Sequence, residues 1–214
     1  MEFASAPRIS EQVLLQELNH RIGNEFFSAM SLVSLAAARS RSNEVKAALS
    51  DVTELLHHYA EVHQALTLPE HDDVVDAAMY LRRLCLAIKR SKLDHMKIGL
   101  EFVASRLELH SQQSWLLGMT LYELITNAAR HAFSGRNGEI RVELMRAGAF
   151  VKCEVLDNGS ARENIRRGRG LKIIGRLVKA LDGRFEQRFG RAGSTSTLVV
   201  PIGRPAARAR VGQS

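Results

Sequence analysis

The chain has 214 residues, of which 45% are hydrophobic and 25% charged, so it can form one large domain or two small ones and is not disordered as a whole. Its apolar stretches fall short of the ~20 residues that span a bilayer, and its N-terminus lacks the features of a signal peptide. The net charge of +7 suits a phosphate ligand or an acidic partner, whereas the scattered basic residues, without an RNA-binding signature or zinc-finger spacing, do not predict nucleic-acid binding.

The first part of the chain predicts a helical hairpin. A helical pattern covers residues 10–39, with apolar side chains at steps of three and four. They are Leu15, Leu18, Ile22, Phe26, Ala29, Val33 and Ala36. The polar run 40–43 interrupts the pattern, and Asn43 is placed to cap a second helix. The apolar stripe of that helix comprises Val45, Ala48, Val52, Leu55, Tyr59, Val62 and Leu66. Two antiparallel helices cannot bury both stripes alone, so we expect a homodimer through residues 10–68, in which two hairpins form a four-helix bundle.

A domain boundary is predicted at residues 68–73, because Pro69 ends the second helix and the run is polar. Beyond it the pattern changes to mixed helices and strands. Helices are expected at 74–89, 112–132 and 170–181, and strands at 97–103, 139–145 and 150–156 and from residues 184 and 195 onward. This order predicts an α+β fold, an α/β sandwich over residues 73–202 with helices on one face of a mixed sheet. The basic tail, 203–214, is expected to be disordered.

The two cysteines, Cys85 and Cys153, lie in apolar contexts with no CxxC partner. We expect them to be reduced core residues, which together with the lack of an export signal favours the cytoplasm. The histidines outside the segments described next show no convincing metal-ligand spacing.

Residues 17–24 contain a candidate nucleophile. His20 lies beside the apolar stripe rather than in it, so its imidazole is expected to be exposed. A mostly neutral imidazole on a rigid helix is a suitable nucleophile. Arg21 and Asn24 can bind phosphate oxygens or orient the ring. Taken alone, such a histidine is more often an inert surface residue.

Three polar side chains share one face of the helix expected at 112–132. Glu123, Asn127 and His131 are spaced four residues apart. The Asn127 amide oxygen can coordinate Mg²⁺, while Arg130 and His131 can approach phosphates. The alternative for this segment alone is an ordinary solvated helix face.

One predicted strand ends in Asp157, Asn158 and Gly159. A buried Asp157 carboxylate can accept a hydrogen bond from an adenine amino group, and Gly159 would let the base approach the backbone. The same three residues on their own are more often a simple turn.

Two glycine-rich segments follow. Gly168, Gly170 and Leu171 precede a helix whose first amides can bind phosphate, although their spacing is not that of a Rossmann fingerprint. The run 193–197, which includes Thr195, forms a glycine turn into the last strand.

The order of these segments resembles that of the sensor histidine kinases. An HRxxN hairpin, then ELxxNAxxH, DNG, GxGL and GST occur between residues 10 and 202, and the first box is typical of the HRxxN phosphoacceptor subgroup. The resemblance implies a dimerisation and phosphotransfer hairpin followed by an ATP-binding domain of the gyrase and Hsp90 type. It implies that His20 is phosphorylated, that Asn127 binds Mg²⁺ and that Asp157 reads adenine. By the same resemblance, catalysis involves Arg21, Asn24 and Glu123, and ATP binding involves Arg130, His131, Gly159, Gly168, Gly170, Leu171 and Thr195.

Three departures from the family's pattern bear on ATP binding. Arg130 replaces a lysine and keeps its charge. The usual second glycine after DNG is missing, since Ser160 and Ala161 follow Gly159. The segment that the resemblance implies as a lid over ATP, residues 160–167, is shorter than is usual in the family. We therefore expect Mg-ATP binding to be weak.

The expected function is that of a two-component histidine kinase, in which ATP phosphorylates His20 and the phosphoryl group passes to an aspartate of a response-regulator receiver domain. Nine residues precede the predicted first helix, too few for a sensor domain. We therefore expect that a separate sensor partner supplies the signal, or that the chain is a freestanding core or a piece of a larger sensor. One alternative is a histidine phosphotransferase, a pseudokinase with the same fold that relays phosphate between receivers without using ATP. A further alternative is a serine kinase of the anti-sigma type, which shares the ATP-binding fold. That function does not explain the presence of the hairpin or of His20.

Overall fold

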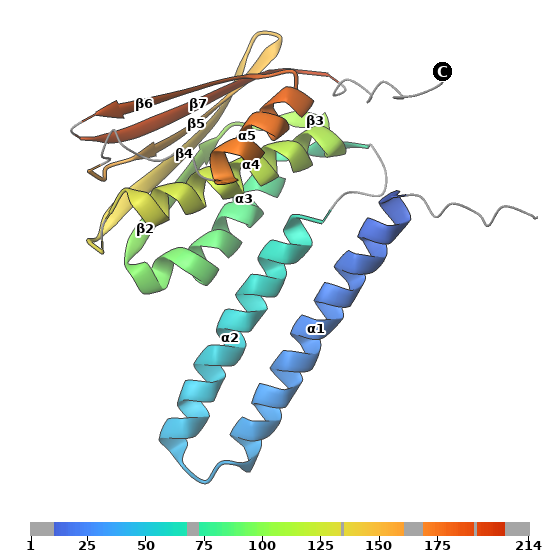
Figure 1. Cartoon of the computed structure of the whole chain (residues 1–214), viewed down its shortest axis with the longest axis vertical. Coiled ribbons are helices and arrows are strands. Elements are labelled where there is room, and N and C mark those ends of the chain that lie inside the picture. The colour runs from blue at the N-terminus through green and yellow to red at the C-terminus, as the bar shows by residue number, and fades with distance from the viewer. Residues whose placement is uncertain (1–10, 68–72, 134, 161–168, 191, 204–214) are drawn as a thin grey trace, which may run out of the picture. The chain divides into compact units, whose positions relative to one another are not determined.

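The computed structural model describes residues 11–67, 73–133, 135–160, 169–190 and 192–203 (Figure 1). The chain divides into two compact units, residues 1–68 and 69–214, and each is described by itself. The sequence-predicted lid, 160–167, therefore lies outside the described residues except for Ser160, as do Gly168 and the basic tail from residue 204.

The first unit is an antiparallel hairpin of helix α1, Glu11–Arg39, and helix α2, Asn43–Ala65. The predicted cap at Asn43 is wrong by one residue. Ser42 has an extended backbone and its Oγ accepts a hydrogen bond from the Val45 amide at 3.3 Å, so Asn43 is already helical. Between the helices, the rings of Phe26 and His63 lie 6.0 Å apart.

The hairpin leaves many apolar side chains in solvent. The predicted stripe is only partly buried, because Leu18 is 53% exposed and Leu55 is 39% exposed. Among the side chains of the two helices that the structure describes, the exposed large apolar ones are Leu18, Phe27, Leu32, Leu35, Val45, Val52 and Leu55. One hairpin therefore cannot cover its own apolar surface.

The second unit begins with a short strand where the sequence predicted a helix. Strand β1, Val74–Asp76, pairs antiparallel with strand β3, Glu108–His110. The Asp76 side chain then accepts a hydrogen bond from the Met79 amide at 3.0 Å and caps helix α3, Ala77–Ile88. The predicted start of this helix at residue 74 is therefore wrong by three residues. A π-helical turn, Lys89–Leu93, and a 3₁₀ turn, Asp94–Met96, follow.

Five strands form the main sheet, and two further helices pack on it (Figure 1). The remaining elements are β2 Ile98–Ala104, α4 Ser111–His131, β4 Gly138–Ala147, β5 Phe150–Asp157, α5 Arg169–Ala180, β6 Arg184–Gly190 and β7 Gly193–Pro201. The strand order is β2-β4-β5-β7-β6, and β2 pairs with β4 in parallel while the other pairs are antiparallel. The predicted fold class, a helical hairpin followed by an α/β sandwich with a mixed sheet, is confirmed.

Side-chain alternation explains why the helices cover a single face of this sheet. In β5, Val151, Cys153 and Val155 are buried, whereas Lys152 and Glu154 point the other way and form an ion pair at 2.7 Å. Leu117, Leu121 and Ile125 of α4 are fully buried on the helix side. The cavity described below lies on this helix-covered side.

Both cysteines are free and buried, as predicted, and burial raises the pKa of the Cys85 thiol to about 12. Among the described residues, no helix has the length and apolar character needed to cross a membrane.

Candidate active site

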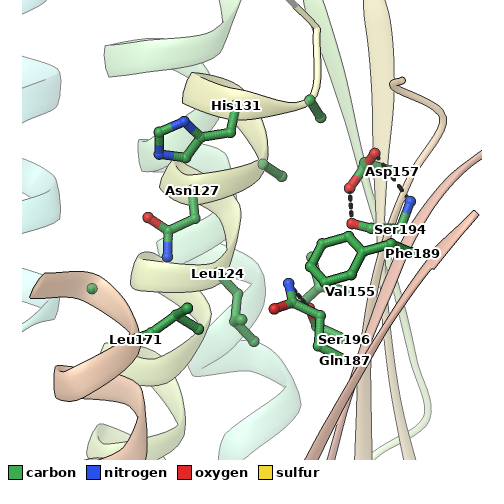
Figure 2. Close-up of a pocket in the computed structure, with 13 residues that line it drawn as sticks. Leu124, Asn127, His131, Val155, Asp157, Leu171, Gln187, Phe189, Ser194 and Ser196 are labelled. Carbon is green, nitrogen blue, oxygen red and sulfur yellow. Dashed lines mark hydrogen bonds between the residues drawn. The ribbon is translucent and has the colours of Figure 1, made fainter. Parts of the chain in front are cut away.

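A cavity opens between α4, the start of α5 and the ends of β5, β6 and β7 (Figure 2). It is lined by Leu124, Asn127, Ala128, His131, Ala132, Val155, Asp157, Gly170, Leu171, Gln187, Phe189, Ser194 and Ser196. Five of these residues, Asn127, His131, Asp157, Gly170 and Leu171, were predicted from separate segments of the sequence. The fold brings those segments together at one place.

Asp157, the last residue of β5, supplies the buried acid of the cavity. It is 9% exposed, and its carboxylate accepts three hydrogen bonds from residues that the structure describes. Oδ1 accepts from the Gly159 amide at 3.0 Å and from the Ser194 amide at 3.3 Å, and Oδ2 accepts from the Ser194 hydroxyl (Figure 2). The carboxylate is therefore held in one orientation and is not left unpaired in the protein.

The turn after Asp157 is bound to its surroundings. A Cβ at Gly159 would lie 2.4 Å from the Ala132 carbonyl oxygen, so only glycine allows this close approach to the end of α4. The Asn158 side chain accepts a hydrogen bond from the Glu139 amide at 2.8 Å. Ser160 donates from its amide to the Ala132 carbonyl at 3.0 Å. The structure thus gives a backbone reason for glycine at 159, whereas sequence reasoning proposed a close approach of the base.

The polar face of α4 meets the beginning of α5. A Cβ on Gly170 would lie 3.0 Å from Asn127 Nδ2, 3.1 Å from Asn127 Oδ1 and 3.3 Å from Glu123 Oε2, so the two side chains come close to the α5 backbone. Burial raises the pKa of Glu123, and the nearby positive charge of Arg130 opposes this shift. Arg130 itself is exposed and does not line the cavity.

The cavity contains residues that sequence reasoning missed. Ser194, Ser196, Gln187 and Phe189 line it, while the predicted Thr195 does not. Side chains alternate across β7, so Ser194 and Ser196 face the helices and Thr195 faces the opposite side of the sheet. The alternation of the last strand is the signal that could have identified the two serines.

Cross-strand pairing arranges these residues in two rows. Asp157, Ser194 and Phe189 form one row across β5, β7 and β6, because Ser194 is the register partner of both other residues. Val155, Ser196 and Gln187 form the next row. In the second row Gln187 donates from Nε2 to the Ser196 hydroxyl oxygen at 3.0 Å.

The candidate phosphoacceptor lies in the hairpin unit. His20 and Asn24 are exposed on α1, as expected for a side chain that must reach a phosphate donor. Arg21, predicted to bind phosphate, forms an exposed ion pair with Glu17, with Nε and Oε1 2.8 Å apart. Exposed pairs of this kind contribute little, about 0–1 kcal/mol, so Arg21 can exchange its partner at small cost.

The residues present are compatible with a divalent cation bound together with a nucleotide. No group of three or more His, Cys, Asp or Glu side chains in the described part of the chain could hold a metal ion by itself. Mg²⁺ commonly keeps several waters and takes one or two protein ligands plus substrate phosphates. The Asn127 amide oxygen, beside Gly170, is placed to be such a ligand.

Two family models match the chain. One, described as "Histidine kinase", covers residues 17–92, and the other, described as "Histidine kinase-like ATPase domain", covers residues 91–195. The chain therefore belongs to the histidine kinases, with the hairpin and the ATPase-type domain of that family.

Named relatives agree with this assignment. The sensor histidine kinase PdtaS of Mycobacterium tuberculosis is 27% identical over 210 residues, which is 92% of this chain and 41% of PdtaS. Blue-light-activated histidine kinase 1 of Erythrobacter litoralis is 23% identical over 202 residues, 92% of this chain and 55% of that protein. The chain thus spans about two-fifths to slightly over half of these relatives.

Solved structures share the fold. The histidine kinase domain of the Erythrobacter litoralis EL346 blue-light activated histidine kinase has a TM-score of 0.58 at 20% identity, over 89% of this chain and 92% of that one. Full-length ShkA in complex with AMPPNP has a TM-score of 0.52 at 17% identity, over 92% of this chain and 47% of that one.

Proposed function

We propose that this chain is the catalytic core of a two-component system, which phosphorylates its own His20 from Mg-ATP and passes the phosphoryl group to an aspartate of a response-regulator receiver domain. The observation that carries the proposal is the convergence of Asn127, Asp157 and Gly170, predicted from three separate motifs, on one cavity. The similarity to ShkA, which was solved with AMPPNP, supports nucleotide binding at such a site.

Each side of the cavity has a distinct task in this proposal. The Asp157 carboxylate accepts a hydrogen bond from the adenine amino group, and the apolar Val155, Leu124 and Leu171 contact the base. At the other end, the beginning of α5 presents amide donors near Gly170, and helix N-termini favour phosphate. Asn127 would hold Mg²⁺, which neutralises phosphate charge when bound.

The chemistry then takes place in two steps. A nitrogen of neutral His20 attacks the γ-phosphorus in line, so that an N–P bond forms, the bond to the bridging oxygen breaks and ADP leaves. The imidazole proton passes to an acceptor at the site. In the second step an aspartate oxygen of the receiver attacks the same phosphorus, and the N–P bond breaks to regenerate His20. Because His20 is exposed on α1, both ATP and the receiver domain can reach it.

We also propose that the chain works as a homodimer through residues 10–68. A second hairpin would cover the apolar side chains that one hairpin leaves in solvent, such as Leu18, Leu35, Val52 and Leu55. Burial of apolar surface stabilises association by roughly 25 cal/mol per Å² before the costs of association are subtracted.

The test is radiolabelling of the purified chain with γ-labelled ATP. Wild-type protein should acquire a label that is labile in acid and stable in alkali, and His20→Ala should acquire none. His57→Ala is the matched control, because His57 is also exposed on the hairpin but lies on α2 and contacts Glu61. Label that persists in the His20 variant would show that another residue is the acceptor.

The same experiment separates the kinase from the phosphotransferase alternative. A phosphotransferase would show no label from ATP, yet its His20 would exchange phosphate with a phosphorylated receiver. A chain that does neither as a folded dimer would exclude both functions.

A further inference from the structure

The outer face of helix α3 carries a stripe of side chains that has no role in the proposed catalysis. Met79, Arg83, Leu86 and Arg90 are spaced four, three and four residues apart, so they share one side of α3 and of the π-helical turn that continues it. All four side chains are exposed, Met79 at 51% and Leu86 at 48%. Since α3 contributes no residue to the lining of the cavity, this outer stripe is separate from the candidate active site.

The positive charge of the outer stripe is not balanced by nearby acids. Among the described residues, the Arg83 guanidinium contacts the Met79 sulfur at 4.0 Å, and neither Arg83 nor Arg90 pairs with a carboxylate. Of residues 82–97, six are Lys or Arg, and the only acid in that segment, Asp94, is already ion-paired within it. A partner that covers the outer stripe must therefore bring negative charge.

We propose that the outer stripe binds the surface of an anionic lipid bilayer. In this arrangement Arg83 and Arg90 meet the lipid phosphates, while the side chains of Met79 and Leu86 enter the boundary between headgroups and acyl chains. Helices that lie on membranes combine cationic and apolar side chains in this way, and the long cationic side chains reach the headgroups while their apolar neighbours are buried. The inference goes beyond the proposed function and does not depend on it.

The alternation within the outer stripe favours a bilayer over an acidic protein helix. A helix that docks on another surface uses apolar anchors repeated at about every turn. Here Arg83 separates the two apolar side chains, Met79 and Leu86, which are seven residues apart. A fluid layer of anionic headgroups above an apolar interior can accommodate both kinds of side chain without matching them one by one. A nucleic acid would contact the arginines through its phosphates and leave Met79 and Leu86 in solvent.

Cosedimentation of the full chain with lipid vesicles tests the proposal. Wild type should bind vesicles of phosphatidylcholine mixed with phosphatidylglycerol and should not bind vesicles of phosphatidylcholine alone. Each arginine at an anionic surface contributes about fivefold to partitioning, so Arg83→Gln combined with Arg90→Gln should weaken binding roughly 25-fold. Raising the salt concentration from about 0.1 M to about 1 M should release the protein, because the Debye length falls from about 10 Å to about 3 Å.

Matched variants separate this surface from general electrostatic attraction. Arg184→Gln combined with Arg188→Gln removes the same charge from exposed positions of β6, on the sheet face away from the helices, and should leave binding nearly unchanged. Arg83→Lys combined with Arg90→Lys keeps the charge and should bind like wild type. Leu86→Ser should weaken vesicle binding severalfold, because an apolar side chain no longer enters the boundary. Binding of heparin, a soluble polyanion, should not change in Leu86→Ser.

Each outcome gives a decision once thermal melts show that the variants are folded. The proposal is overturned if wild type stays in solution with anionic vesicles at the lower salt concentration, if the two α3 arginines can be replaced without loss, or if the β6 pair costs as much. Vesicle binding that is unchanged in Leu86→Ser and is competed by heparin would instead assign the outer stripe to a soluble polyanion such as a nucleic acid. If the double glutamine variant does not fold, Arg90→Glu alone provides the comparison, with a loss of more than about fivefold.

Discussion

Gly170→Ala should separate nucleotide binding from stability. Gly170 is the second residue of α5, and a Cβ there would lie 3.0 and 3.1 Å from the amide atoms of Asn127. Ordinary contacts of a Cβ begin at 3.4 Å, so the Asn127 amide must move by a few tenths of an ångström. The contact is with the end of a side chain that can rotate, so the fold can adapt while the ligand geometry at Asn127 changes.

The two effects of the substitution have opposite signs. Replacing a helical glycine by alanine stabilises a helix by about 0.5–1 kcal/mol, less at a helix end. Binding sites lose affinity when a ligating group is displaced by about 0.5 Å. We therefore expect a melting temperature that is unchanged or slightly raised, together with roughly tenfold weaker Mg²⁺–nucleotide binding, about 1.4 kcal/mol.

Thermal unfolding and calorimetry with a non-hydrolysable ATP analogue measure the two effects. The control is Gly175→Ala in the same helix, where an added Cβ meets nothing within 4 Å. It should raise the melting temperature and leave binding unchanged. Wild-type affinity in Gly170→Ala, or an equal loss of affinity in both variants, would refute the role of the Asn127–Gly170 contact.

Three further perturbations test other parts of the proposal. Asp157→Ala should lose ATP-dependent labelling but leave His20 able to accept phosphate from a phosphorylated receiver; loss of both activities in a folded variant would contradict this division. Leu55→Glu should convert the dimer into monomers in light scattering, because it places an unpaired charge in the bundle, and a monomeric wild type at micromolar concentration would exclude the bundle. Glu123→Gln should gain stability relative to wild type as the pH rises above 4.5, because the raised pKa of Glu123 makes its ionisation costly in the folded state; a pH-independent difference in melting temperature would argue against this.

Sequence reasoning predicted the elements whose pattern is local. Apolar steps of three and four marked α1, α2 and α4, and alternation marked β4 and β5, because those periods follow directly from backbone geometry. Asn127, Asp157 and Gly170 could also be predicted from the sequence, since each lies at a recognisable turn or helix face. That these three residues meet at one site was implied only by the order of the motifs, which resembles that of the histidine kinases.

Tertiary structure decided the features that depend on a partner segment. Val74–Asp76 forms a strand because β3 is available to pair with it, and β3 lies more than 30 residues later in the chain. The exposure of Leu18 within one hairpin could not be predicted, because a helical stripe does not reveal which part of it a neighbouring helix covers.

The choice between Ser194 and Thr195 shows the same dependence at the site. Both are small hydroxyl residues in one glycine-rich run, and the alternation of the strand places them on opposite faces without showing which face lies toward the cavity. The register of β7 between β5 and β6 places Ser194 opposite Asp157 and turns Thr195 to the other face. Because side chains alternate with a period of two, a shift of one residue exchanges the faces, and only the pairing of the strands determines which serine or threonine reaches the cavity.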